Sequence, residues 1–108
     1  MTENKRLITF IIPAYNEENN IRRFYTETNK IVTSLNSYIC EFVFIDDGSN
    51  DSTWQVIKEI SNLNSIVKGL RLSRNFGKEM ALTAGIIEWT KSSDAVIFMD
   101  ADLQHPPS

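Results

Sequence analysis

The sequence predicts an α/β fold, with a parallel sheet of about four strands and helices on both faces. Two observations predict it. Four short, nearly continuous apolar runs recur along the chain, and each stretch between them carries apolar residues at helical spacing. A β-α-β-α-β-α-β order of this kind calls for a parallel sheet with right-handed crossovers. In such sheets ligands bind at the carboxyl ends of the strands.

The first half of the chain contains two predicted strands and one predicted helix. Residues 7–12 (LITFII) form a strand that should be buried on both faces and is closed by Pro13. Residues 42–45 (FVFI) form a second buried strand, entered through residues 38–41. Between them a helix begins at Ile21, and its apolar face is expected to consist of Phe24, Tyr25, Ile31, Val32 and Leu35.

The second half contains two more predicted helices and strands. Ser52 followed by Gln55 matches a capping box, which predicts a helix from about Thr53. Residues 66–72 form a strand despite Gly69, and residues 95–99 (AVIFM) form the most evenly apolar strand, which should be buried. The helix over residues 53–61 should bury Trp54, Ile57 and Ile60, and the helix over residues 78–90 carries Met80, Ala81, Ala84, Ile87 and Trp89 in helical array.

Composition narrows the possible functions. With 108 residues, 42% hydrophobic and 23% charged, residues 1–108 are expected to form one globular domain. The net charge of -3 comes without a basic stripe, which disfavours nucleic acid as a partner. Cys40 is the single cysteine, so we expect a small buried side chain, no internal disulfide and a cytoplasmic location for this chain. The end at residues 106–108, without a closing element, suggests that the domain is truncated.

Acidic side chains follow three of the four predicted strands. The loops concerned cover residues 13–20, 46–52 and 101–108, and a fourth loop covers residues 73–77. Because parallel strands end at one edge of the sheet, these loops should meet there. The acidic residues would repel one another strongly unless a cation compensates, which predicts a divalent metal. They are Glu17, Glu18, Asp46, Asp47, Asp100 and Asp102.

Asp100 and Asp102 form the sharpest motif. Residues two apart in an extended chain project to the same side, so both carboxylates can address one ligand. Hard oxygen ligands suit Mg²⁺ or Mn²⁺, ions that commonly accept substrate phosphate oxygens as further ligands. Gln104 continues the alternation as a third ligand, and His105 is an alternative. A D-x-D tripeptide can also simply cap a turn; its place after a buried strand, opposite other carboxylates, favours the metal site.

The other three loops offer groups suited to a nucleotide. Asp47 can accept a hydrogen bond from a nucleobase N–H, although an Asx turn that caps the next helix is the simpler alternative. Tyr15 can stack on a base and Glu17 can hold a nucleotide edge, or the segment only begins a helix. Arg74 and Lys78 can neutralise phosphate, or they form a solvated basic loop.

Four segments together resemble the family 2 inverting glycosyltransferases of GT-A fold. They are I-P-A-Y-N-E from Ile12, D-D-G-S from Asp46, R-N-F-G from Arg74 and D-A-D-L-Q-H-P-P from Asp100. The similarity spans nearly the whole chain. It is greatest toward the branch of dolichol-phosphate mannosyltransferase and the bacterial polyprenyl-phosphate (bactoprenol) glucosyltransferases. The resemblance implies that this chain is the Rossmann-like, nucleotide-sugar-binding half of a GT-A domain.

The resemblance also implies roles for individual residues. The implied donor is a UDP- or GDP-sugar, and the metal is Mg²⁺ or Mn²⁺, held by Asp102 and Gln104 together with Asp100. The nucleotide pocket would be lined by Pro13, Tyr15, Glu17, Ile45 and Asp47, and the sugar nucleotide would contact Asp100, Ala101 and Asp102.

The implied reaction is attack on the anomeric carbon by a lipid phosphate or an acceptor hydroxyl, with inversion. The acceptor site and the general base are expected beyond Ser108, so residues 1–108 alone should not transfer sugar. The full-length protein is expected at the cytoplasmic face of the membrane, and an open sheet edge would allow pairing with another copy in a homo-oligomer.

Other functions remain as alternatives. A polysaccharide or protein-glycan glycosyltransferase of the same family would share these motifs. A nucleotidyltransferase would present a glycine-rich loop after the first strand, where this chain has P-A-Y-N-E. A non-enzymatic, Mg²⁺-binding regulatory domain would place its acidic pair after the first strand, which does not match this order. A purely structural module leaves the acidic edge unexplained.

Overall fold

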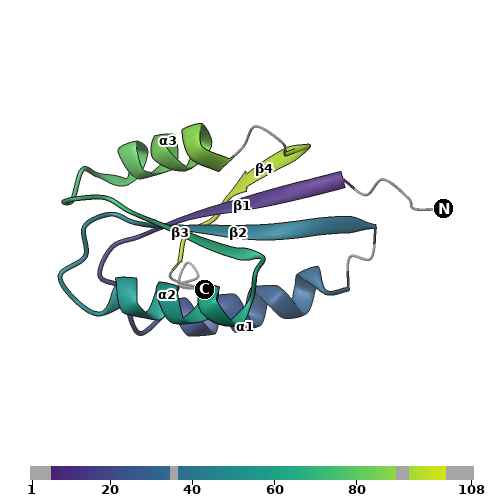
Figure 1. The fold of residues 1–108 in the computed structure, drawn as a ribbon, viewed down its shortest axis with the longest axis horizontal. Coiled ribbons are helices and arrows are strands. Elements are labelled where there is room, and N and C mark those ends of the chain that lie inside the picture. The colour runs from purple at the N-terminus through teal and green to yellow at the C-terminus, as the bar shows by residue number, and fades with distance from the viewer. Residues whose placement is uncertain (1–5, 35–36, 90–92, 102–108) are drawn as a thin grey trace, which may run out of the picture.

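The computed structural model describes residues 6–34, 37–89 and 93–101, and it contains the predicted elements in the predicted order (Figure 1). The elements are β1 (Arg6–Ala14), α1 (Ile21–Val32), β2 (Tyr38–Asp46), α2 (Thr53–Leu63), β3 (Val67–Arg71), α3 (Lys78–Trp89) and β4 (Ala95–Phe98). In these ranges, none of the helices has the length and apolar character needed to cross a bilayer.

The four strands form one parallel sheet in the order β3-β2-β1-β4. In this order the chain moves outward from β1 to β2 and β3, and then crosses back to place β4 on the other side of β1. Helices α1 and α2 cover one face of the sheet, and α3 covers the other (Figure 1). The order therefore reverses between β1 and β4, which is where doubly wound sheets bind their ligands.

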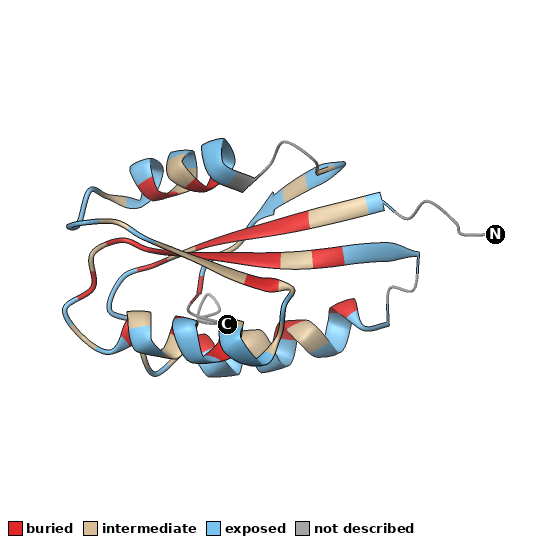
Figure 2. Ribbon diagram, in the orientation of Figure 1, coloured by how far each residue is buried: buried red, intermediate tan, exposed pale blue. Residues whose placement is uncertain are grey.

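The two central strands are buried on both faces, as predicted (Figure 2). Successive side chains of a strand point to opposite faces, so each strand serves two cores. On the side of α1 and α2, Phe10 stacks on Phe42 with ring centroids 5.4 Å apart. On the side of α3, Ile11 and Val43 belong to a second, smaller cluster.

The prediction that β4 is a buried strand is wrong. Ile97 is 42% exposed and Phe98 is 49% exposed, and the strand spans Ala95–Phe98. The physical reason is position: within the described residues β4 pairs only with β1, and α3 packs chiefly on β1 and β2. An apolar run reveals a strand, but its neighbours in the sheet decide whether both faces are covered.

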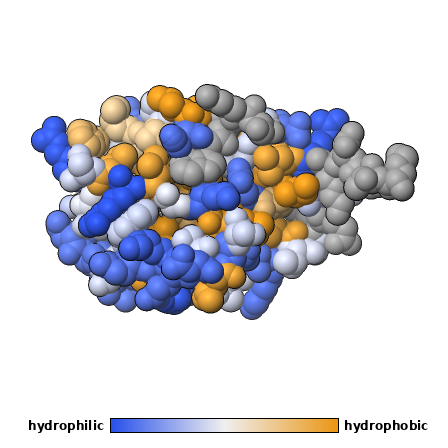
Figure 3. Space-filling view, in the orientation of Figure 1, coloured by the Kyte–Doolittle hydropathy of each residue, from blue (hydrophilic) through white to orange (hydrophobic). Residues whose placement is uncertain are grey.

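The expected apolar face of α3 is also only partly correct. Ala81 is fully buried, whereas Met80 and Ile87 are exposed. Gly85, one turn after Ala81, faces the sheet, because a Cβ atom added there would lie 2.9 Å from Ile11 Cγ2. The large side chains of the strands thus fill this interface and the helix contributes small ones. Hydrophobic side chains consequently appear on the surface on the side of α3 and β4 (Figure 3).

Helix α1 buries a narrower face than expected. Phe24 and Val32 are buried as predicted, and Thr28 lies between them on the same stripe. Ile31 is exposed, because it lies one position off this i, i+4, i+8 stripe. Tyr25 is half-buried and contacts the Phe42 ring edge to face. The side chains of Leu35 and Trp89 lie outside the described residues.

We predict that Gly85→Leu lowers the free energy of unfolding by at least about 1 kcal/mol, because the added side chain overpacks the contact of α3 with Ile11. The matched control is Ile87→Ala on the exposed side of the same helix, which should change stability by less than about 0.5 kcal/mol. Urea unfolding of both variants measures this. A larger loss for Ile87→Ala would show that α3 faces the sheet differently.

Candidate functional site

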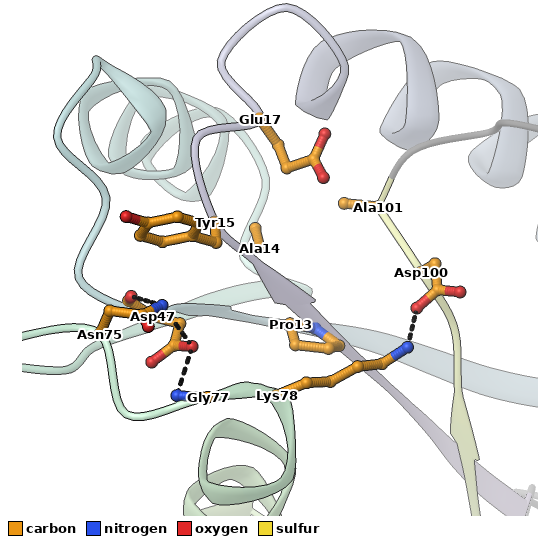
Figure 4. A pocket seen from close by; sticks show the side chains of 10 residues that line it. All are labelled: Pro13, Ala14, Tyr15, Glu17, Asp47, Asn75, Gly77, Lys78, Asp100 and Ala101. Atoms are coloured by element: carbon orange, nitrogen blue, oxygen red, sulfur yellow. Dashed lines mark hydrogen bonds and ion pairs between the residues drawn. The ribbon is translucent and has the colours of Figure 1, made fainter.

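A pocket of about 390 Å³ lies at the carboxyl ends of the strands, where the strand order reverses (Figure 4). Segments from all four predicted loops meet there, as the sequence predicted. The lining residues are Pro13, Ala14, Tyr15, Glu17, Asp47, Asn75, Gly77, Lys78, Asp100 and Ala101.

The loops that follow β1 and β2 are joined by hydrogen bonds. Asn16 has a positive φ of 54°, and its backbone N–H donates to Ser49 Oγ at 2.8 Å. In return, its side-chain Oδ1 accepts from the backbone N–H of Asn50 at 2.8 Å. The backbone N–H of Glu17 donates to Thr53 Oγ1 at 2.8 Å. These bonds hold an uncommon backbone conformation in place and aim Tyr15 and Glu17 at the pocket.

Asp51, rather than the predicted capping box, organises the start of α2. Helix α2 begins at Thr53 as predicted, but Ser52 makes no side-chain capping bond, so the capping box expected from Ser52 and Gln55 is not formed. Instead, Asp51 Oδ1 accepts from the backbone N–H of Thr53 at 2.9 Å, and Asp51 Oδ2 accepts from the backbone N–H of Glu18 at 3.3 Å. Burial opposes ionisation of Asp51, but the hydrogen bonds from Thr53 and Glu18 outweigh it and lower its pKa.

Asp47 holds the third loop. The residue is only 3% exposed, and its carboxylate accepts three hydrogen bonds. Oδ1 accepts from the backbone N–H of Phe76 at 2.8 Å, and Oδ2 accepts from Asn75 Nδ2 and from the backbone N–H of Gly77, both at 3.0 Å. Asp47 also lines the pocket. Its contact with a nucleobase stays a prediction. The structure shows that Asp47 also fixes the conformation of the loop before α3, which the sequence did not reveal.

Gly48 permits the close approach of the second and third loops. Its φ is +72°, and a Cβ atom added there would lie 2.2 Å from the carbonyl carbon of Arg74 and 2.4 Å from the backbone nitrogen of Asn75. Both atoms belong to the backbone, so they cannot move away by a side-chain rotation. Glycine is therefore required for two independent reasons, its conformation and its lack of a side chain.

Asp46 is wholly buried and turns away from the pocket. Its Oδ1 accepts from the backbone N–H of Ser49 at 3.0 Å, so the Asx-type turn considered for this motif is formed by Asp46. Its Oδ2 accepts no hydrogen bond from the described residues, and Arg71 Nε lies 3.5 Å away. The adjacent aspartates thus have different surroundings: Asp47 faces the pocket and Asp46 faces the side of α2.

Lys78 and Asp100 form an ion pair across the pocket. The lysine side chain extends from the first turn of α3 past Pro13, and its Nζ lies 2.5 Å from Asp100 Oδ1 (Figure 4). The Asp100 side chain is 64% exposed, so it is open to a ligand entering the pocket. A predicted phosphate-binding cation and a predicted metal ligand therefore neutralise each other in this structure. A bound metal and phosphate would provide both with new partners.

The remaining predicted residues divide into three groups. Pro13, Tyr15, Glu17 and Ala101 line the pocket. Ile45 does not, because its side chain is fully buried in the core beneath α3. Asp102, Gln104 and His105 lie outside the described residues. Within residues 6–34, 37–89 and 93–101, there is no group of three or more histidine, cysteine, aspartate or glutamate side chains that could hold a metal ion, at Asp100 or elsewhere.

Arg74 lies in a second pocket rather than beside Lys78. This pocket has a volume of about 590 Å³ and shares Tyr15 and Asn75 with the first. The Arg74 guanidinium stacks on the Phe76 ring, with 4.8 Å between the guanidinium carbon and the ring centroid. The second pocket is lined by Tyr15, Gly48, Ser49, Asn50, Arg71, Leu72, Ser73, Arg74 and Asn75. Arg71, at the end of β3, was not identified from the sequence, because no motif contains it.

Fold and site together define a doubly wound α/β protein with a pocket lined by polar and charged residues at the switch point of its sheet. Comparison with known proteins is more specific: residues 9–108 match the model of glycosyl transferase family 2. The chain belongs to this family, which confirms the family inferred from the four loop motifs.

A curated relative agrees with this assignment. A prophage bactoprenol glucosyl transferase homolog of Escherichia coli is 43% identical over 99 residues, which cover 92% of this chain and 31% of that protein. The chain spans about 30% of the length of the curated relatives that it matches.

Solved structures share the fold. A Pyrobaculum calidifontis mannosyltransferase, in complex with GDP-Man and Mn²⁺, superimposes with a TM-score of 0.75 at 22% identity, over 96% of this chain and 30% of that chain. Glucosyl-3-phosphoglycerate synthase of Mycobacterium tuberculosis, in complex with Mn²⁺, UDP and glucosyl-3-phosphoglycerate, gives a TM-score of 0.61 at 28% identity, over 94% and 35%. The predicted Rossmann-like GT-A fold is therefore confirmed.

We predict that Gly48→Ala is more destabilising than Gly77→Ala. Both glycines have positive φ, at +72° and +102°, so each alanine carries a conformational cost of about 1 kcal/mol. At Gly77 no atom lies within 4 Å of the added Cβ, whereas at Gly48 the backbone of Arg74 must move. Thermal unfolding should show the larger loss for Gly48→Ala. Equal losses would mean that the second and third loops do not approach each other so closely.

A second prediction concerns acid stability. Because the folded-state pKa of Asp51 is lowered, its contribution to stability is present above the ordinary aspartate pKa and is lost as pH falls through the folded value. Asp51→Asn should therefore destabilise the protein at neutral pH, and the difference from wild type should shrink at pH values below the ordinary carboxyl range. Urea unfolding of both proteins across pH measures this difference. A difference independent of pH would contradict the charge-assisted role of Asp51.

Proposed function

We propose that this chain forms the donor-binding part of a glycosyltransferase that takes a sugar from a UDP- or GDP-sugar. The observation that carries the proposal is the pocket at the switch point, where loops from all four strands place carboxylates, an aromatic ring and a lysine. Membership of glycosyl transferase family 2 supports it. The nucleotides named for the two solved structures, GDP-Man and UDP, support this class of donor.

The diphosphate of the donor is placed at the Lys78 and Asp100 end of the pocket. Lys78 offers an ammonium group at the start of a helix, where phosphate binding is favourable. Asp100 offers exposed carboxylate oxygen, a hard ligand that fits Mg²⁺ or Mn²⁺, and Asp102 and Gln104 would complete the protein ligands. When bound, the metal would supply positive charge that stabilises the nucleoside diphosphate as a leaving group.

The nucleoside extends from this end over Tyr15. The Tyr15 ring is exposed and borders both pockets, so it can stack against a base or ribose that passes from one to the other. Glu17 lines the first pocket beside Tyr15, and one of its oxygens accepts from Asn20 Nδ2 at 2.7 Å. That hydrogen bond holds the carboxylate in place to receive a hydroxyl or N–H of the nucleotide.

We propose a polyprenyl phosphate as the acceptor, on the basis of relatives named bactoprenol glucosyl transferase. In the reaction an acceptor oxygen forms a bond to the anomeric carbon while the bond from that carbon to the nucleoside diphosphate breaks. Attack from the face opposite the leaving group inverts the configuration. A lipid acceptor places the full-length protein at the cytoplasmic face of a membrane, where the nucleotide sugar is available.

The test is a calorimetric titration of UDP and GDP into the protein, with and without Mn²⁺. We expect metal-dependent binding that Asp102→Ala abolishes. Lys78→Met should weaken it about tenfold, because a charge-assisted phosphate contact is lost. Lys30→Met, which removes an exposed lysine from α1, is the matched control and should have no effect. Binding that is indifferent to both Mn²⁺ and Asp102 would contradict the proposed donor site.

A further inference from the structure

Arg71 is anchored by a buried carboxylate. Asp46 and Arg71 are paired neighbours at the ends of β2 and β3, and Arg71 Nε lies 3.5 Å from Asp46 Oδ2. That oxygen is buried and accepts no hydrogen bond from the described residues, so Arg71 is its nearest compensating charge. Because an uncompensated buried carboxylate is costly, the Arg71 guanidinium is held at this position.

An aromatic ring fixes the same guanidinium from a second direction. The guanidinium carbon of Arg71 lies over the Trp54 ring, 5.9 Å from its centroid. The ring itself rests against β3 at Gly69, where an added Cβ atom would be 3.2 Å from Trp54 Cζ3. Gly69 thus provides the space for Trp54, and Trp54 supports Arg71.

The anchored guanidinium retains donors for a ligand. Its Nε faces Asp46, and the side chain is still 50% exposed. Arg71 also lines the second pocket. An arginine presents five N–H donors in a rigid plane, so those on its two terminal nitrogens remain available on the pocket side. Held by Asp46 and Trp54, the donors keep one orientation, which is what selective recognition requires.

We infer that Arg71 determines which nucleobase the second pocket accepts, and that Asp46 and Trp54 are positioning residues for it. The inference rests on the proposed function, which places the diphosphate at Lys78 and Asp100 and extends the nucleoside past Tyr15 into the second pocket. Arginine donors match bases with acceptor edges, which are O4 of uracil or O6 and N7 of guanine. Cytosine and adenine present an amino group at the equivalent position and are disfavoured.

The experiment compares UDP, GDP, CDP, ADP and inorganic pyrophosphate as ligands in the presence of Mn²⁺. Wild type should bind UDP or GDP at least about tenfold more tightly than CDP and ADP. Arg71→Lys keeps the charge beside Asp46 but loses the planar donors, so it should remove most of this preference. Its pyrophosphate affinity and its melting temperature should match those of the wild type. Arg23→Lys, on the exposed surface of α1, is the matched control and should keep the preference.

A second variant tests the positioning. Asp46→Asn keeps the acceptor for Ser49 but removes the charge that holds Arg71, so it should reduce the base preference in the same direction. An Arg71→Lys protein that still binds UDP or GDP more tightly than CDP and ADP would overturn the inference and leave the proposed function standing. An equal loss of affinity for all five ligands in Arg71→Lys would also overturn it, because Arg71 would then only maintain the fold. A wild type that binds no nucleoside diphosphate with Mn²⁺ would overturn the proposed function and this inference together.

Discussion

The buried carboxylate of Asp47 is the point on which the arrangement of the pocket depends. It comes directly after β2 and accepts hydrogen bonds from Asn75, Phe76 and Gly77, so the loop before α3 takes its shape from it. A carboxylate withdrawn from water needs such donors, and backbone N–H groups in a tight loop need such an acceptor. Each therefore satisfies the other, and Gly48 allows the two loops to come into contact.

The two adjacent aspartates illustrate how one motif serves two purposes. Side chains alternate along an extended chain, so Asp46 and Asp47 leave the end of β2 in opposite directions. Asp47 reaches the pocket and the third loop, and Asp46 reaches the side of α2, where Arg71 compensates its charge. The motif thus connects the pocket that receives the diphosphate in our proposal to the pocket that receives the base.

Much of the fold and part of the site followed from local patterns. Apolar runs of the kind seen at residues 42–45 are visible because both faces of a central strand are covered, and the loop positions follow from the order of the strands. Local patterns gave wrong predictions where burial depends on which strand or helix packs against a residue. Ile97 is apolar yet exposed, because β4 lies at an edge of the described sheet. Ile45 is part of the core rather than the pocket, because α3 packs over it.

The sequence by itself therefore determined the α/β class, the order of the elements, the family and the four loops that carry the site. These depend on periodicity, on turn-forming residues and on motifs of adjacent residues, all of which are local. Only the tertiary structure decided that Asp47 holds the third loop, that Lys78 pairs with Asp100, and that Arg71 lies between Asp46 and Trp54. Each of these contacts joins residues about 17 to 30 positions apart, from different strands, helices or loops. Such contacts depend on the register of the sheet and on the packing of the helices rather than on any local signal.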